Sequence, residues 1–163
     1  MLGKRKWSWL WLVVLIALPG TVVAGKAKRK VPTNKQQASY VRMLKYNRIA
    51  SKRLQLLIDR QETFTKTDRE QKAYLMFRLG SVHYNNGILS SRVLRWCKAY
   101  PKQRCPVRPH YPRIYQNEGV RIFTQIWNKY PRFSKRSYLG RLLARYYRKR
   151  GNLEKAKQFQ SSR

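Results

Sequence analysis

The balance of charge constrains this chain more than any other feature of its sequence. Thirty-eight Lys and Arg residues face only six Asp and Glu in 163 residues, which gives a formal net charge of +32. Six carboxylates can neutralise a small part of that charge, so the folded chain has to keep most cations at its surface. Apolar packing must therefore hold the fold together, while the surface attracts polyanions.

The first 24 residues have the order of a secretory signal peptide. Basic residues 4–6 precede an apolar run over 7–18, Pro19-Gly20 breaks the run, and small residues lead to a cleavage site after Ala24. The alternative is a retained anchor, because residues 7–24 approach the roughly 20 residues that span a bilayer. No Cys stands directly after the run, at the position of a lipoprotein cleavage site, which argues against a lipoprotein. Either alternative predicts export, to the periplasm or the outer face of the inner membrane.

Residues 25–35 form a basic segment that contains a proline, and we expect a flexible, unpacked arm there. Its expected polyanion-binding cations are Lys26, Lys28, Arg29 and Lys30.

From residue 36 the apolar residues recur with the spacing of a helix, which we expect over about 36–60. The apolar side of this helix consists of Tyr40, Met43, Ala50, Leu54, Leu57 and Ile58. The other side carries a row of cations, namely Arg42, Lys45, Arg48 and Lys52. Acidic residues do not alternate with these cations, so helix-stabilising ion pairs are missing and like charges repel.

Further helical patterns follow along the chain. Asp68 is the expected N-cap of a second helix with Glu70 in its first turn, and Asn85-Asn86-Gly87 predicts its end. A short helix over 88–100 and a proline-rich segment over 101–112 come next.

A third helix is predicted over about 114–129, and a fourth over the region of 139–147, which Gly151 ends before a last short helix. The apolar positions of these two helices are Val120, Phe123, Ile126, Trp127 and Tyr130, then Leu139, Leu142, Leu143, Tyr146 and Tyr147. The opposite side of the fourth helix carries Arg141, Arg145 and Arg148. No segment has the pattern of a strand, so the sequence predicts an all-α fold of antiparallel helical hairpins.

Cys97 and Cys105 are the only cysteines of the chain. In an oxidising compartment they can close a short loop, worth about 2–3 kcal/mol when the geometry is relaxed. Two free thiols are the alternative. A zinc site is not expected, because only His83 and His110 could complete a ligand set.

The C-terminal hairpin resembles the tetratricopeptide repeat (TPR), a helix–turn–helix unit of about 34 residues. The residues that carry the resemblance, and that we expect to pack the repeat, are Leu143, Ala144, Tyr147, Gly151, Leu153 and Ala156. A weaker echo runs from Leu79-Gly80 to Gly87 and resumes at Gly119, with residues 88–115 as a Cys-containing insertion. The resemblance implies a short TPR-like solenoid over 36–163 with a concave binding surface. An unrelated small helical bundle is the alternative.

The sequence offers little for catalysis. Most of the acids sit near predicted helix ends, where they need no catalytic role, and no second carboxylate accompanies Glu118. His83 and His110 do not form a recognisable pair, and no phosphate-binding loop, nucleophile elbow or metal motif is present. We therefore expect no enzyme, no catalytic or metal-binding residue, no small-molecule substrate and no cofactor.

These features together predict an exported, basic helical adaptor that holds another protein of the cell envelope. Its cations would dock on acidic phospholipid, lipopolysaccharide or an acidic cell-wall polymer. A nucleic-acid-binding protein is the alternative, for which the segment 145–150 (RYYRKR) is the most suggestive stretch. A third possibility is that basic composition is common to the whole proteome, in which case the charge identifies no partner.

Overall fold

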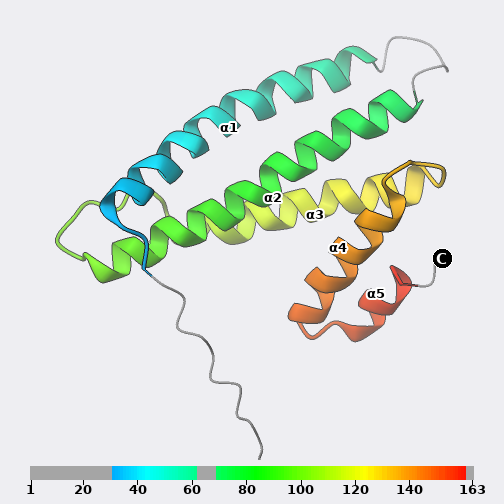
Figure 1. Ribbon diagram of the computed structural model, residues 1–163. Coiled ribbons are helices and arrows are strands. Elements are labelled where there is room, and N and C mark those ends of the chain that lie inside the picture. The colour runs from blue at the N-terminus through cyan, green and yellow to red at the C-terminus, as the bar shows by residue number, and fades with distance from the viewer. Residues whose placement is uncertain (1–30, 62–68, 161–163) are drawn as a thin grey trace, which may run out of the picture. The chain divides into compact units, whose positions relative to one another are not determined.

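The computed structural model describes residues 31–61 and 69–160, and all regular structure in these residues is helical (Figure 1). The helices are α1 (Asn34–Gln61), α2 (Arg69–Ala99), α3 (Tyr111–Lys129), α4 (Arg136–Lys149) and α5 (Leu153–Gln158). The predicted all-α class is confirmed. The predicted signal peptide, the cations of residues 26–30 and the N-cap Asp68 lie outside the described residues.

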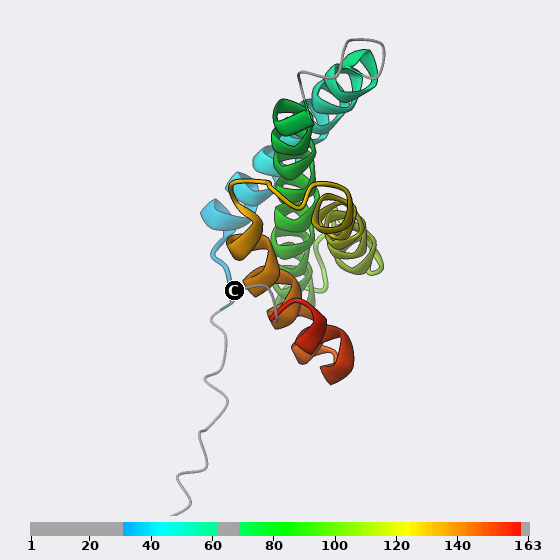
Figure 2. The same ribbon diagram turned by 90° about the vertical axis from the view of Figure 1, so that its right-hand side faces the viewer.

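Helix α2 is the centre of the fold. It packs along α1 on one side and along α3 on the other, and both of these helices run antiparallel to it (Figures 1 and 2). Helix α4 folds back against α3, and α5 packs against α4. The described residues from 31 to 160 belong to one compact unit, so a chain that begins at Gly25 retains all five of these helices.

The main hydrophobic core joins α2, α3 and α4. Phe123 and Ile126 of α3 and Leu139 and Leu143 of α4 are almost completely buried, as their spacing predicted. Phe77 of α2 lies against the same core, with its ring centroid 5.8 Å from that of Phe123. Fully burying a large apolar side chain contributes about 1.5–3 kcal/mol to the free energy of folding, so these residues are a main source of the stability of this region.

The predicted end of the second helix at Asn85-Asn86-Gly87 is wrong, because α2 continues through these residues to Ala99. Gly87 is buried against the start of α3, where a Cβ atom would lie 2.8 Å from the carbonyl oxygen of Pro112. Asn86 is also buried and accepts a hydrogen bond from Asn47 Nδ2 at 2.8 Å. Contacts with α1 and α3 therefore keep these residues helical, although the local sequence alone resembles the end of a helix. Residues 88–99 belong to α2, so the irregular segment is confined to 100–110.

Helix α1 starts earlier than the predicted arm allows. Thr33 Oγ1 accepts a hydrogen bond from the Gln36 backbone at 3.3 Å, and Gln36 Oε1 accepts one from the Thr33 backbone at 3.0 Å. This reciprocal pair is a capping box. Trp96 Nε1 of α2 donates to Asn34 Oδ1 at 2.8 Å, and Pro32 is buried. The end of the predicted arm is therefore part of the packed structure.

The apolar side predicted for α1 is only partly buried. Leu54 and Ile58 pack against the core, but Met43 is 47% exposed and Leu57 46%. The physical reason is that α2 is the helix that packs along most of α1, and extensive contact with one helix covers a narrow strip of its surface.

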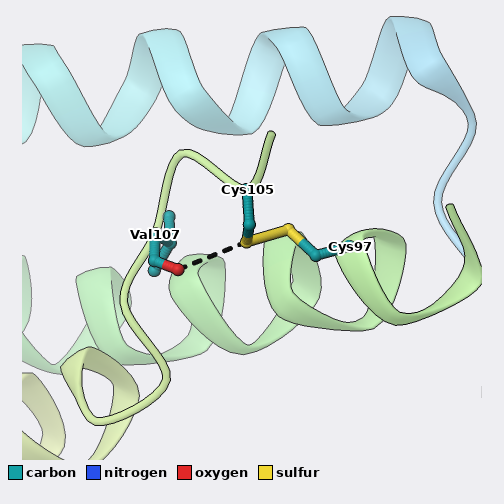
Figure 3. Close-up of a disulfide and its surroundings, with 3 residues drawn as sticks. All are labelled: Cys97, Cys105 and Val107. Carbon is teal, nitrogen blue, oxygen red and sulfur yellow. Dashed lines mark hydrogen bonds between the residues drawn. A yellow bond between two sulfur atoms is a disulfide. The ribbon is translucent and has the colours of Figure 1, made fainter. Parts of the chain in front are cut away.

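The predicted disulfide is confirmed between Cys97, in the last turns of α2, and Cys105, in the following loop (Figure 3). The S–S distance is 2.10 Å and the two Cα atoms are 5.4 Å apart. Cys105 Sγ also lies 3.2 Å from the carbonyl oxygen of Val107, a buried residue. The bridge holds the loop against the end of α2.

The C-terminal hairpin packs as predicted at most of its positions. Leu143, Ala144 and Ala156 are buried, and Gly151 has a φ of +77° at the turn between α4 and α5. The ring of Tyr147 stacks on that of Phe159, with centroids 5.6 Å apart.

The packing role predicted for Leu153 is wrong, because its side chain is 58% exposed. It is the first residue of α5, a helix of six residues, and its position at the start of so short a helix leaves it in solvent. The resemblance of the hairpin to a TPR remains a prediction.

Candidate anion-binding surface

Three predicted cations of α4 come together on one exposed side of the helix. Arg141, Arg145 and Arg148 follow one another at spacings of four and three residues, which places them above one another along the helix. Leu139, Leu143 and Tyr146 bury the opposite side of α4, so the row is fixed in direction by the core. We call these three residues the arginine row.

A cavity of about 420 Å³ opens between the arginine row and the end of α5. All three arginines contribute to its wall, together with Trp127, Ser137, Gly140, Ala144, Phe159 and Gln160. Gly140 allows a close approach here, since a Cβ atom on it would lie 2.7 Å from the carbonyl oxygen of Phe159. We call this hollow the α5-side cavity.

A second cavity, of about 360 Å³, lies on the other flank of α4, toward α2. Arg141 and Arg145 line it as well, beside Ser81, Tyr84, Asn85, Ile88, Phe123, Tyr138 and Leu142. We call it the α2-side cavity. The arginine row thus forms a ridge between two hollows, and none of the described residues lining either of them is acidic.

Two tyrosines near the row, Tyr84 and Tyr146, carry uncharged hydroxyl groups. Burial raises the pKa of Tyr84, an effect that the positive charge of Arg145 partly offsets. Burial also raises the pKa of Tyr146, whose hydroxyl donates a hydrogen bond to Asn117 Oδ1 at 2.7 Å. Neither phenol supplies negative charge at neutral pH, so the positive potential of the ridge is not cancelled locally.

Aromatic rings position further cations around the same hairpin. The guanidinium of Arg136 lies 4.0 Å from the ring centroid of Trp127 and donates to its backbone oxygen at 2.5 Å. Arg150 lies over Tyr146 at 4.6 Å, and Lys155 over Tyr147 at 5.2 Å. Such contacts contribute about 0.5–1 kcal/mol at exposed sites and restrict the side chains.

The sequence located the arginine row but missed the cavity walls and these cation–π pairs. Trp127, Gly140 and Phe159 belong to three different segments. Helical periodicity predicts which residues of one helix face inward, but it does not predict which segments meet to form a cavity.

The predicted row on α1 forms a separate surface, because α1 packs against α2 whereas α4 packs against α3. Its members Arg42, Lys45, Arg48 and Lys52 are all exposed, as predicted. Arg42 and Lys45 also line a shallow hollow of about 510 Å³ together with Arg104 and Trp96.

Glu118 forms a bidentate ion pair with Arg121 on the next turn of α3. Its two carboxylate oxygens accept hydrogen bonds from Arg121 Nε at 2.9 Å and from Arg121 Nη2 at 2.6 Å, and this lowers the pKa of Glu118. A carboxylate that is ionised at neutral pH has no proton to donate as a general acid.

His83 lies near this pair, half-buried in α2. Burial lowers its pKa, while the nearby Glu118 has a smaller opposite effect. Its Nδ1 atom is buried without a hydrogen-bond partner, and its ring centroid is 6.3 Å from that of Tyr115. His110 is exposed in the loop before α3. We found no cluster of potential metal ligands within residues 31–61 and 69–160.

Comparisons with known proteins place the chain in no family: no family model matches it, and neither curated proteins nor solved structures give a significant match. In the part of the chain that the structure describes, no helix has the length and apolarity needed to cross a membrane.

Proposed function

We propose that the protein is an exported helical adaptor that docks on phosphate-bearing material of the cell envelope and holds another protein there. The observation that supports this function is the arginine row, a ridge of three exposed guanidinium groups between two cavities whose described lining residues include no acid. The excess of 32 positive charges gives such a surface a strong attraction for polyanions.

The chemistry of the row favours phosphate. A guanidinium group presents a planar set of donors that matches phosphate or carboxylate oxygens in a bidentate manner. With a rise of about 1.5 Å per residue, the Cα atoms of Arg141 and Arg148 are roughly 10 Å apart along the helix axis. A row of this length suits a ligand with several anionic groups, such as lipopolysaccharide, a patch of acidic lipid headgroups or an acidic wall polymer.

The experiment compares the chain from Gly25 to Arg163 with the variant R141Q/R145Q/R148Q in binding to purified lipopolysaccharide and to acidic wall polymer. The matched control is K98Q/K102Q/R108Q, which removes the same charge from exposed positions around the cysteine loop. We expect the row variant to lose at least about tenfold in affinity, with a much smaller loss in the control, because hydrogen bonds to charged groups contribute about 1.5–3 kcal/mol each. Equal losses in the two variants would mean that net charge, and not the row, determines binding.

A pull-down from the envelope fraction at low and moderate salt tests the adaptor part of the proposal. A protein partner that survives moderate salt supports an adaptor, because purely electrostatic capture is screened at that salt concentration. If only anionic polymers are retained, the protein is an anion-binding module without a protein cargo.

Nucleic-acid binding is the second candidate, and one observation favours it. Tyr138 is 51% exposed and lines the α2-side cavity beside Arg141 and Arg145, so a ring and two cations lie together. By contrast, Tyr146 is buried and Tyr147 stacks on Phe159, which removes the two rings of the segment 145–150 as platforms for bases. Binding to DNA would weaken with salt at a log–log slope of about −0.9 per phosphate contacted.

A further inference from the structure

Helix α1 exposes an unusual amount of apolar surface. Five large side chains along it are between 46% and 65% exposed, namely Met43, Tyr46, Ile49, Leu56 and Leu57. At about 100° per residue, Ile49 and Leu56 point in nearly the same direction, roughly opposite to the buried Leu54 and Ile58. Tyr46 lies at the edge of the same side, whereas Met43 and Leu57 lie nearer to the buried strip. The side of α1 that faces away from α2 therefore exposes two aliphatic side chains, with Tyr46 at its edge. We call it the outer face of α1.

Cations share this outer face with the apolar side chains. Lys35, Arg42, Lys45, Lys52 and Arg53 are all exposed on α1. The first acidic residue of the helix is Asp59, near its C-terminal end, where it accepts a hydrogen bond from Gln55 at 2.7 Å. The outer face is thus positive over most of α1 and carries exposed apolar side chains over residues 46–56.

This combination restricts what can cover the face. A second copy of the chain would bring two rows of cations together with no acidic residue between them, and like charges in contact are repulsive. The occupant has to offer apolar surface and negative charge side by side. A bilayer with acidic headgroups does so, since helices with apolar residues among Lys and Arg lie in its interface and exposed aromatic residues such as Tyr46 favour that depth.

The position of α1 in the chain supports the same occupant. The basic run Lys26–Lys30 and the apolar segment 7–24 directly precede it in the sequence. Nine residues separate Ala24 from Asn34, and a fully extended chain of this length would span at most about 36 Å. When segment 7–24 is in a membrane, whether as an anchor or before cleavage, α1 is held close to the bilayer surface.

We infer that the outer face of α1 is a membrane-docking surface that binds bilayers containing acidic phospholipid. Ile49, Leu56 and Tyr46 enter the boundary between headgroups and acyl chains, while the neighbouring cations contact lipid phosphates. The inference rests on the proposed function, because it names acidic lipid as one anionic surface that the adaptor binds and α1 as the element that binds it. The arginine row on α4 then remains available for another ligand.

The test uses residues 25–163 and vesicles of phosphatidylcholine with or without phosphatidylglycerol, in a sedimentation assay at physiological salt. I49S/L56S removes two apolar side chains from the outer face and leaves the charge unchanged. Its matched control is I114S/L153S, which alters two aliphatic residues of similar exposure, 53% and 58%, on α3 and α5. We expect I49S/L56S to lose at least about tenfold in binding to acidic vesicles, because each aliphatic side chain inserted removes apolar surface from water. The control should bind like the parent chain.

Fluorescence gives a second readout that depends on insertion and not on charge. Tyr46→Trp places a reporter at the most exposed of the five positions, above the background of Trp96 and Trp127. We expect the emission of the introduced indole to shift to shorter wavelength with acidic vesicles and to be quenched by brominated lipid. All substituted residues are exposed, and unchanged circular dichroism and melting confirm that each variant folds.

The outcomes separate this inference from the proposed function. If I49S/L56S binds acidic vesicles as tightly as the parent, or if brominated lipid does not quench the reporter of Tyr46→Trp, α1 is not the docking surface. If the parent binds no acidic vesicle but R141Q/R145Q/R148Q loses binding to lipopolysaccharide or wall polymer, the inference fails and the proposed function stands. If I49S/L56S loses vesicle binding while the row variant binds every polymer normally, the inference stands and the function proposed for the row fails.

Discussion

Gly80 of α2 and Gly119 of α3 face each other across the contact between these two helices. A Cβ atom on Gly119 would lie 2.8 Å from the carbonyl oxygen of Gly80 and 2.8 Å from the backbone nitrogen of Tyr84. A Cβ atom on Gly80 would lie 2.7 Å from the ring of Phe123. The absence of side chains at both positions lets the two backbones touch, and the burial of Phe123 depends on this approach.

Substituting Gly119 by Ala should destabilise the protein, although Ala is the better helix former. The new methyl group would meet backbone atoms of α2, which cannot rotate away, and overpacking of this kind costs about 1–3 kcal/mol. Urea denaturation followed by circular dichroism measures the change. Asn128→Ala, at an exposed position of α3, is the control and should leave stability nearly unchanged. Equal midpoints for G119A and N128A would show that the helices are not in contact at Gly119.

Loss of the disulfide between Cys97 and Cys105 should lower stability by about 2–3 kcal/mol, because the unfolded chain gains the freedom of the short loop. Urea denaturation of C97S/C105S against the oxidised parent measures this loss. Mass spectrometry without reductant tests the bond itself, since the oxidised chain is lighter by two hydrogen atoms. A mass that does not change on reduction would contradict the bridge.

Stability should fall as the pH drops below about 6.5, and His83 should cause much of this change. Burial lowers the pKa of His83 in the folded chain, so the unfolded chain, with the ordinary value of 6.5, binds the proton first. The loss begins as pH falls through 6.5 and levels off below the lowered pKa of the folded state. His83→Gln should flatten the urea midpoint across this window.

Glu118 has its effect in a different range of pH. Arg121 lowers the pKa of Glu118 from 4.5, so the stability that its carboxylate contributes is lost only below that value. For His83, the contradicting result would be a parent chain whose free energy of unfolding does not change between about pH 7 and pH 5. Such a chain would show that His83 is not desolvated.

Removing the hydroxyl of Tyr146 should cost about 0.5–1.5 kcal/mol, because Asn117 Oδ1 then loses its hydrogen bond across the contact of α3 and α4. Thermal unfolding of Tyr146→Phe measures this cost. The control is Tyr138→Phe, since Tyr138 is 51% exposed, and it should melt like the parent. If the two variants melt alike, the hydrogen bond does not contribute to stability.

Helices that bury one clear side were predictable from the sequence. Phe123 and Ile126 of α3 and Leu139 and Leu143 of α4 recur at helical spacing and are buried, and the arginines predicted for the opposite side of α4 are exposed. The disulfide was predictable because only two cysteines exist and a short turn-like segment that contains Pro101 separates them. The arginine row was predictable because its three residues also recur at helical spacing, on the side opposite the apolar residues.

Predictions that depended on local signals alone were less reliable. Asn85-Asn86-Gly87 resembles a helix end, yet α3 covers Gly87 and Asn47 bonds to Asn86, so α2 continues. Met43 and Leu57 have the spacing of core residues, yet among the described helices the extensive packing along α1 comes from α2, which leaves both side chains exposed. In both cases the deciding contacts come from residues far away in the chain, which periodicity does not identify.

The sequence by itself determined the class of this protein: helices with an apolar side, a surplus of cations that has to face outward, and one bridge in the loop after the cysteine-bearing helix. Only the tertiary structure decided where apolar side chains stay uncovered, because burial depends on which helices lie next to one another. It also decided that the cations of α4 border two cavities, whereas those of α1 lie among exposed apolar side chains. The charge of a side chain follows from its residue type, whereas the groups that surround it depend on how the helices pack.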